Sequence, residues 1–164
     1  MRQCLLVLVS LGVITHHEAA AQPKPASIQG VWQVVQINMT GASPRTISIP
    51  EPRPNLTIVT ARHYSHIQIE SEGPRTAPSD IAKATADELR ALWGPFGGEA
   101  GTYELTGNTI TTHPIVAKNP AMMAPGAFMT LAFKVQGDTV WLTEQRNQRG
   151  PIASPTTFKA VRVE

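Results

Sequence analysis

The stretch of residues 30–38, GVWQVVQIN, decides the fold because it opens the first strand-like run of the chain. Its counterpart is the last run, Phe158-Lys159-Ala160-Val161-Arg162-Val163. Most of the sequence between them consists of short β-patterned runs joined by tight turns. A glycine–x–tryptophan on a first strand and an arginine on a last strand are typical of the closed end of a small barrel. We therefore expect Gly30, Trp32 and Arg162 to close one end of such a barrel.

Residues 1–21 have the features of a cleavable export signal. Arg2 gives a positive start, and an apolar core follows from Cys4 to Ile14. Three alanines then supply small residues for cleavage after Ala21. The apolar core is shorter than the roughly 20 residues that a spanning helix needs, and an uncleaved anchor is the alternative. Because Cys4 lies inside the core rather than after it, a lipoprotein is disfavoured. We expect a secreted or periplasmic protein that has no membrane attachment after cleavage.

The rest of the chain is predicted to be a spacer, residues 22–27, and one domain, residues 28–164. The net charge of the whole sequence is only +2, and no lysine–arginine cluster occurs, so nucleic acid is not an expected partner. The one cysteine of the sequence lies in the export signal. The mature domain must therefore be held by a packed core without disulfides. The sequence leaves its oligomeric state open.

Strand-like runs follow one another along the domain, at residues 31–38, 56–60, 63–70, 102–105, 109–117, 127–135, 139–146 and 156–163. Two pairs of runs are joined by Thr106-Gly107-Asn108 and by Gln136-Gly137-Asp138. A glycine in these turns can take the positive φ of a tight hairpin. An almost unbroken meander favours an all-β, eight-stranded antiparallel up-and-down barrel, because closure removes the exposed edges of a sheet. Such a barrel can hold one small ligand.

The connection between the third and fourth runs carries the one predicted helix. Thr85 and Glu88 have the spacing of a capping box, and Gly94-Pro95 ends the helical pattern. Leu89, Leu92 and Trp93 recur at helical spacing, so we expect the helix to pack on the barrel as a lid or plug. The proline-rich residues 41–54 and 73–80 are predicted loops. Four glycines between residues 94 and 101 indicate a flexible entry to the fourth strand.

With Gly30, Trp32 and Arg162 in these places, the chain resembles the lipocalin-like families of the calycin type. It is also similar to small secreted bacterial lipocalin-like proteins, through His63-Tyr64-Ser65, Ala100-Gly101-Thr102-Tyr103-Glu104 and Trp141-Leu142-Thr143-Glu144. The resemblance covers most of residues 28–164. It implies that Trp32 plugs one end of the barrel and that Arg162 stacks across the indole, a contact worth roughly 1 kcal/mol. The missing disulfide and the long helical insertion depart from the family. The resemblance implies a fold rather than a ligand.

Strand alternation indicates which residues could line the interior. In the run 139–146, Leu142, Glu144 and Arg146 share one face, whereas Trp141 leads the opposite face. If Leu142 points inward, so do the two charged residues, which must then be paired because an isolated buried charge costs several kcal/mol. A methionine-containing loop, residues 119–126, could cap the mouth. The predicted ligand-binding residues are Tyr64, Tyr103, Met129, Leu131, Phe133, Leu142, Glu144 and Arg146.

Histidines and motifs restrict the chemistry that the domain can perform. His63 and His66 are three apart on one strand, so they point to opposite faces and are not expected to share one metal ion. We expect one of them to face solvent, the other to line the barrel, and His113 to lie near a rim. No nucleophile elbow, phosphate loop or dinucleotide fingerprint occurs, so no cofactor is expected. Asn55-Leu56-Thr57 is a glycosylation sequon, which has meaning only in a host that glycosylates.

These observations support three hypotheses. The leading one is a secreted or periplasmic barrel that binds a small, largely apolar or amphipathic molecule in its interior. The second is a small barrel enzyme, an isomerase, cyclase or hydrolase, although the scarcity of catalytic motifs disfavours an enzyme. The third is a periplasmic inhibitor or protein-binding module that uses the loop of residues 41–54. The candidate catalytic residues of the second hypothesis are Tyr64, Tyr103, His113, Glu144 and Arg146.

Overall fold

The computed structural model describes residues 27–48, 54–71 and 73–164. The predicted export signal, its cleavage site and all but the last residue of the predicted spacer lie outside the described residues. The elements in chain order are β1 (Gly30–Met39), β2 (Arg45–Ser48), β3 (Asn55–Val59), β4 (His63–Ile69), η1 (Ile81–Lys83), α1 (Ala86–Trp93), β5 (Phe96–Thr106), β6 (Thr109–Ala117), η2 (Pro120–Met123), β7 (Met129–Gln136), β8 (Thr139–Asn147), β9 (Gly150–Pro151) and β10 (Thr156–Arg162).

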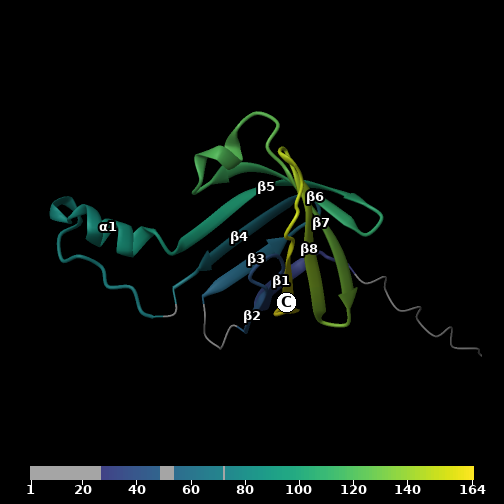
Figure 1. Cartoon of the computed structure of the whole chain (residues 1–164), viewed down its shortest axis with the longest axis horizontal. Helices are drawn as coiled ribbons and strands as arrows, with labels where there is room; N and C mark the ends of the chain where they lie inside the picture. Colours follow the sequence, from purple (N-terminus) through teal and green to yellow (C-terminus); the bar gives the residue numbers. More distant parts are fainter. Residues whose placement is uncertain (1–26, 49–53, 72) are drawn as a thin grey trace, which may run out of the picture.

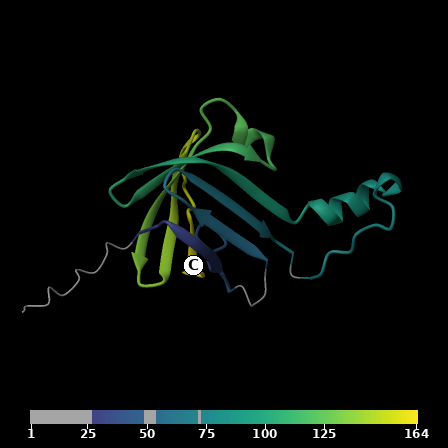
Figure 2. The same ribbon diagram turned by 180° about the vertical axis from the view of Figure 1, so that it is seen from behind.

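Eight of these strands form one closed antiparallel barrel (Figure 1; Figure 2 shows it from behind). Their order around the barrel is β10, β1, β3, β4, β5, β6, β7 and β8. The pairing of β8 with β10, in which Leu142 lies opposite Phe158, completes the ring. The short strands β2 and β9 pair only with β1 and β8. The eight-stranded antiparallel barrel that the meander predicts is confirmed.

Glycine turns set the register of two hairpins, as the sequence indicates. Gly107 joins β5 to β6 with a φ of 58°, and Gly137 joins β7 to β8 with a φ of 57°. This left-handed conformation is readily adopted by glycine and rarely by other residues. The hairpin between β3 and β4 has no glycine. There the hydroxyl of Thr60 accepts a hydrogen bond from the backbone N–H of His63 at 3.1 Å.

A bulge in β1 is held by one buried side chain. The pairing of β1 with β10 shifts register between Val34 and Gln36. The backbone pairing of β1 with β3 reaches only as far as Trp32 and Thr57. Beyond that point the Asn55 amide takes over: its oxygen accepts from the Val34 N–H at 2.7 Å, and its nitrogen donates to the Val34 carbonyl at 3.0 Å. The Asn55 side chain thus satisfies two buried backbone groups that would otherwise lack a strand partner.

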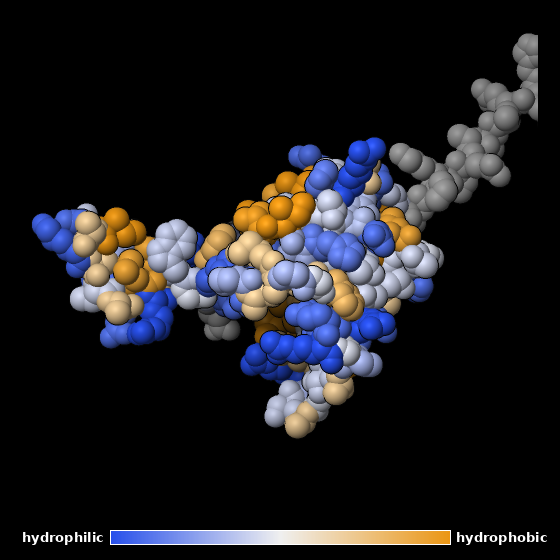
Figure 3. Space-filling model, turned by 90° about the horizontal axis from the view of Figure 1, so that it is seen from above, coloured by the Kyte–Doolittle hydropathy of each residue, from blue (hydrophilic) through white to orange (hydrophobic). Residues whose placement is uncertain are grey.

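The segment between β4 and β5 leaves the barrel as an arm that carries α1 (Figures 1 and 2). The capping box of Thr85 and Glu88 forms as predicted. The expected packing of α1 on the barrel, as a lid or plug, is wrong. Within the described chain no residue of α1 is buried, and Trp93 is 52% exposed. Apolar residues of the arm face solvent, apart from the barrel (Figure 3). The helix follows the third strand of the barrel, as predicted. This strand is labelled β4 because the short strand β2, which is not one of the eight barrel strands, precedes it in the chain.

Two predicted loops contain strands. Residues 45–48 of the proline-rich stretch form β2, whose Ile47 lies opposite Ile37 of β1, and residues 49–53 of the same stretch lie outside the described residues. The glycine-rich stretch belongs largely to β5, which begins at Phe96. A Cβ at Gly101 would collide with the His113 carbonyl on β6, so glycine permits a close approach of two strands. Glycines here reflect strand packing rather than a flexible loop.

Candidate functional site

The interior of the barrel encloses a cavity of about 280 Å³. This volume is slightly below the roughly 300–1,000 Å³ of typical ligand pockets, so it fits a small molecule. Apolar side chains dominate the wall, and a few polar groups interrupt it. The lining residues are Ile28, Trp32, Val34, Thr57, Val59, Tyr64, His66, Gln68, Glu99, Ile110, Thr112, Met122, Met129, Leu131, Val140, Leu142, Glu144, Phe158 and Ala160.

Trp32 and Arg162 close the end of the barrel that we call the floor. Trp32 is 2% exposed, and its indole N–H donates to the Ile28 carbonyl at 2.7 Å. The guanidinium carbon of Arg162 lies 4.1 Å from the centre of the Trp32 ring. The same guanidinium donates to the carbonyls of Gln29 and Ser27, at 2.8 Å each. The cation contributes roughly 1 kcal/mol by its contact with the ring and also ties the start of the domain to its last strand.

Gly30 completes the floor for a steric reason. Its φ is 142°, a conformation that side chains of L-residues rarely adopt, and a Cβ there would collide with the Arg162 guanidinium. The glycine two residues before Trp32 therefore leaves the space through which the arginine passes. The Gly-x-Trp pattern and Arg162 act as one unit in this structure.

Strand β4 supplies the polar part of the wall. Tyr64, His66 and Gln68 alternate inward along it, whereas His63 is exposed. The Tyr64 hydroxyl donates to Glu99 Oε1 at 2.9 Å, and His66 Nδ1 lies 2.7 Å from the Thr57 hydroxyl. One of the two histidines of β4 thus lines the cavity and the other faces solvent, as strand alternation predicts.

Burial shifts the acid–base behaviour of this wall. Burial raises the pKa of the Glu99 carboxyl above its usual 4.5, although the hydrogen bond from Tyr64 acts in the opposite direction. Burial lowers the pKa of His66 below 6.5, so its imidazole is neutral at pH 7. Burial and the neighbouring Glu99 charge together raise the pKa of the Tyr64 hydroxyl. Tyr64 therefore remains a hydrogen-bond donor at neutral pH.

Glu144 lines the cavity from β8, but Arg146 does not. Val140, Leu142 and Glu144 point inward in alternation. The pairing of β7 with β8 then shifts register, because Leu131 lies opposite Glu144 whereas Thr130 lies opposite Arg146. The exposed Arg146 instead places its guanidinium 5.5 Å from the Phe128 ring. The predicted inward pair of Glu144 and Arg146 is therefore wrong, since the bulge changes the alternation between them.

A second pocket of about 360 Å³ forms the mouth, at the end where β4 leaves and β5 enters the barrel. His66, Gln68, Glu99 and Met122 line both this pocket and the interior cavity, so the two spaces adjoin. Met122 comes from η2, the short helix in the predicted capping loop between β6 and β7. Met123 beside it is 42% exposed. One methionine of that loop thus reaches the interior cavity.

Lys118 borders the mouth and is committed to the base of the arm. Its ammonium donates to the carbonyls of Trp93, Gly94 and Phe96, at 2.5, 2.8 and 2.5 Å. An ammonium has three N–H donors, and these three bonds use all of them. Lys118 therefore fixes the junction between α1 and β5, and its charge lines the mouth pocket together with Glu70 and Glu99.

The structure brings five of the predicted ligand-binding residues to the cavity: Tyr64, Met129, Leu131, Leu142 and Glu144. Phe133 packs against the buried core without lining the cavity, as does Tyr103, whose hydroxyl donates to the Thr60 carbonyl at 2.5 Å. Of the candidate catalytic residues, only Tyr64 and Glu144 line it. His113 lies on the other face of β6 from the inward Thr112, and its Nε2 is 3.9 Å from Glu104.

Sequence reasoning missed Glu99, Gln68 and Thr112 as lining residues. Glu99 was hidden because its glycine-rich surroundings indicate a loop, although it lies opposite His66 in the pairing of β4 with β5. Gln68 could have been found by continuing the alternation from Tyr64 through His66. Thr112 could have been found in the same way from the buried Ile110.

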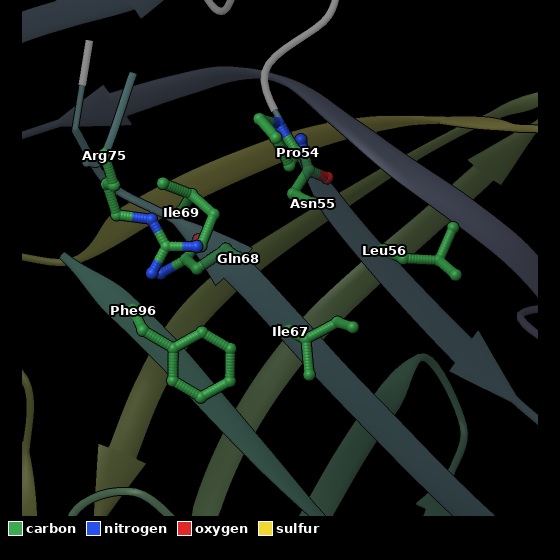
Figure 4. A pocket seen from close by; sticks show the side chains of 8 residues that line it. All are labelled: Pro54, Asn55, Leu56, Ile67, Gln68, Ile69, Arg75 and Phe96. Carbon is green, nitrogen blue, oxygen red and sulfur yellow. The ribbon is translucent and has the colours of Figure 1, made fainter. Parts of the chain in front are cut away.

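A third hollow of about 370 Å³ lies on the outside of β3, β4 and β5. Leu56, Ile67 and Phe96 give it an apolar surface, and Arg75 reaches over it from the arm (Figure 4). Ile67 is 46% exposed. This groove is open to solvent and lacks the enclosure of the interior cavity, so it is a weaker candidate for a small-molecule site.

Two further tests concern metals and membranes. Among residues 27–48, 54–71 and 73–164, no three His, Cys, Asp or Glu side chains come close enough to hold a metal ion. Over the same described part of the chain, no helix has the length and apolar character that crossing a bilayer requires.

Comparisons with known proteins show neither a family nor a function for the chain. No protein-family model matches the chain, and a search of curated proteins found no match. Among solved structures, the chain is similar to a lipocalin-like protein from Bacteroides uniformis ATCC 8492, with 15% identity and a TM-score of 0.45. That alignment covers 82% of this chain and 97% of the other. The closed ring of eight strands, with its indole floor, is itself a lipocalin-like fold.

Proposed function

We propose that the protein binds a small, largely apolar molecule, one that can carry a polar head, inside the barrel. The observation that carries this proposal is the interior cavity of about 280 Å³, which has a mostly apolar wall and adjoins the mouth. Water is poorly held in such a space, so an apolar ligand of matching size gains roughly 25 cal/mol per Å² of surface that it buries. The sealed floor leaves the mouth as the route of entry.

The wall is arranged along the axis of the barrel. Near the floor lie Trp32, Val140 and Ala160, each at most 2% exposed. Towards the mouth lie His66, Gln68 and Glu99, which line both adjoining pockets. A ligand would therefore place its apolar part on the indole and its polar head at the mouth.

Titration with a fluorescent apolar probe tests this proposal. We expect saturable binding with one site per chain. Leu131→Trp, which fills part of the cavity, should weaken binding, whereas the matched change Leu105→Trp at a residue that is 46% exposed should not. A folded protein that shows no saturable binding would overturn the proposal.

We also propose that the protein acts in the periplasm or outside the cell. The positive start, apolar core and alanine cleavage site of residues 1–21 support this. Expression of the full sequence in a bacterium, followed by fractionation and amino-terminal sequencing, should recover a mature chain that begins at Gln22. A full-length chain in the cytoplasmic fraction would contradict it.

A further inference from the structure

We infer that the cavity selects its ligand by charge and takes small amphiphiles with a cationic nitrogen headgroup in preference to anionic ones. This inference rests on the proposed function and names the class of ligand. It excludes simple fatty-acid anions as the preferred occupants, although their tails would fit an apolar wall equally well.

Two carboxylates line the cavity and belong to different parts of its wall. Glu99 projects from β5, and Glu144 projects from β8. Glu144 lies on the mouth side of Val140 and Leu142 along β8, and Glu99 lines both the cavity and the mouth pocket. A ligand whose tail rests on Trp32 therefore carries its head towards acidic groups.

No lysine or arginine among the described residues lines the interior cavity. Lys118 at the mouth donates its three N–H groups to backbone carbonyls. Arg162 lies against Trp32 and is held by the carbonyls of Gln29 and Ser27. Arg146 lies over Phe128. These three cations are thus engaged in other contacts. The charge of Lys118 remains at the mouth, where two carboxylates, Glu70 and Glu99, line the same pocket. Among the described residues that line the interior cavity, no lysine or arginine offsets Glu99 and Glu144.

The remaining basic group of the cavity, His66, does not supply that charge. Its ring is bonded to Thr57, and burial lowers its pKa below 6.5, so it is neutral at pH 7. A ligand carboxylate would have to lose its hydration beside groups of like charge, which is costly in a partly buried site. A ligand ammonium would instead meet opposite charge, and it would favour the ionised form of Glu99, whose pKa burial raises.

Both carboxylates retain capacity to accept hydrogen bonds. Glu99 Oε1 accepts from the Tyr64 hydroxyl at 2.9 Å, and Glu144 Oε2 accepts from the Thr156 N–H at 3.0 Å. An ionised carboxylate offers about four acceptor positions, so these bonds fix each side chain and leave room for donors of a ligand. The whole chain has a net charge of +2, which by itself would favour anions. A preference for cations must therefore come from the cavity.

Calorimetric titration with octylammonium, octan-1-ol and octanoate at neutral pH tests the inference, because these probes share one tail and differ in the head. We expect octylammonium to bind about tenfold or more tighter than octanoate, which is a modest electrostatic difference, and octan-1-ol to fall between them. In the double variant Glu99→Gln/Glu144→Gln, this ratio should fall to about two or less. Its unfolding midpoint checks that it folds.

Glu104→Gln is the matched control, because it removes one carboxylate whose side chain is 79% exposed and outside the cavity. It should leave the ratio unchanged. Equal or tighter binding of octanoate by the unaltered protein would overturn the inference while leaving the proposed function intact. A preference that persists in the double variant would also overturn it. Binding of none of the three probes would overturn both proposals.

Discussion

At the floor of the barrel, an aromatic ring, a guanidinium and three backbone carbonyls satisfy one another and exclude water, with Trp32 only 2% exposed. At the mouth, polar side chains such as Gln68 and Glu99 line an open pocket, and the neighbouring arm holds α1 away from the barrel. One end is thus closed by contacts within the chain, and the other presents groups that can contact something else. The difference suggests that substitutions at the floor act mainly on stability, whereas those at the mouth act mainly on binding.

The largest expected effect is at the floor. Trp32→Ala removes a buried indole and leaves a cavity, and such changes cost about 3–5 kcal/mol. Chemical denaturation measures this loss. Trp93→Ala on the arm, where the ring is 52% exposed, should stay within about 0.5 kcal/mol. If the two variants lose similar stability, the floor is not the stabilising end.

Asn55→Ala tests whether a polar side chain on the mouth half of the barrel can matter as much for stability as the residues of the floor. It leaves the N–H and carbonyl of Val34 without their partner. Each unsatisfied buried group costs about 1–3 kcal/mol, so we expect a loss of about 2–6 kcal/mol for the two groups. Hydrogen exchange at the Val34 amide should also accelerate. Unchanged exchange there would show that water or the backbone replaces the Asn55 amide.

Arg162→Lys separates charge from geometry at the floor. Lysine keeps the positive charge but has no planar group to stack on the indole while donating to both Gln29 and Ser27. We expect a loss of about 1–2 kcal/mol in thermal unfolding. Arg149→Lys, which exchanges the same residue types at an exposed position, is the control. Equal stability of both variants would mean that charge alone closes the floor.

The smallest effect concerns pH and the polar wall. The pKa of His66 is lowered in the folded chain, so the unfolded chain binds the proton more readily and stability is lost as pH falls below about 6.5. Glu99 changes stability in the opposite direction. Its pKa is raised in the folded chain, so the stability that it contributes below pH 4.5 is lost as the pH rises through this raised pKa.

The variant His66→Gln isolates the histidine contribution. Between about pH 7.5 and about pH 5.5, unaltered protein should lose more thermal stability than this variant. Equal losses would show that folding leaves the pKa of His66 unchanged, which would contradict an uncharged His66 beside the two carboxylates.

The barrel and its floor could be predicted from the sequence because each depends on local or paired chemistry. Gly107 and Gly137 set hairpins by their own conformation. The closure of the floor depends on only three residues, Gly30, Trp32 and Arg162. The site was only half predictable: Tyr64 and Leu142 follow strand alternation, but the register shift before Arg146 leaves no mark in the sequence. Glu99 was missed because it lies in a glycine-rich stretch. Such a stretch has the same composition whether its glycines allow close strand packing or form a flexible loop.

The bonds between Asn55 and Val34 also matter for production of the protein. The nitrogen that would carry a glycan in the Asn55-Leu56-Thr57 sequon donates to a buried carbonyl, and Asn55 is 9% exposed. A glycosylating host could modify Asn55 only before the sheet has formed, since the folded chain withholds that nitrogen. A chain modified in this way would lack the bond from the Asn55 amide nitrogen that holds β3 to β1 at Val34. Folded material secreted from such a host should therefore carry no sugar at Asn55.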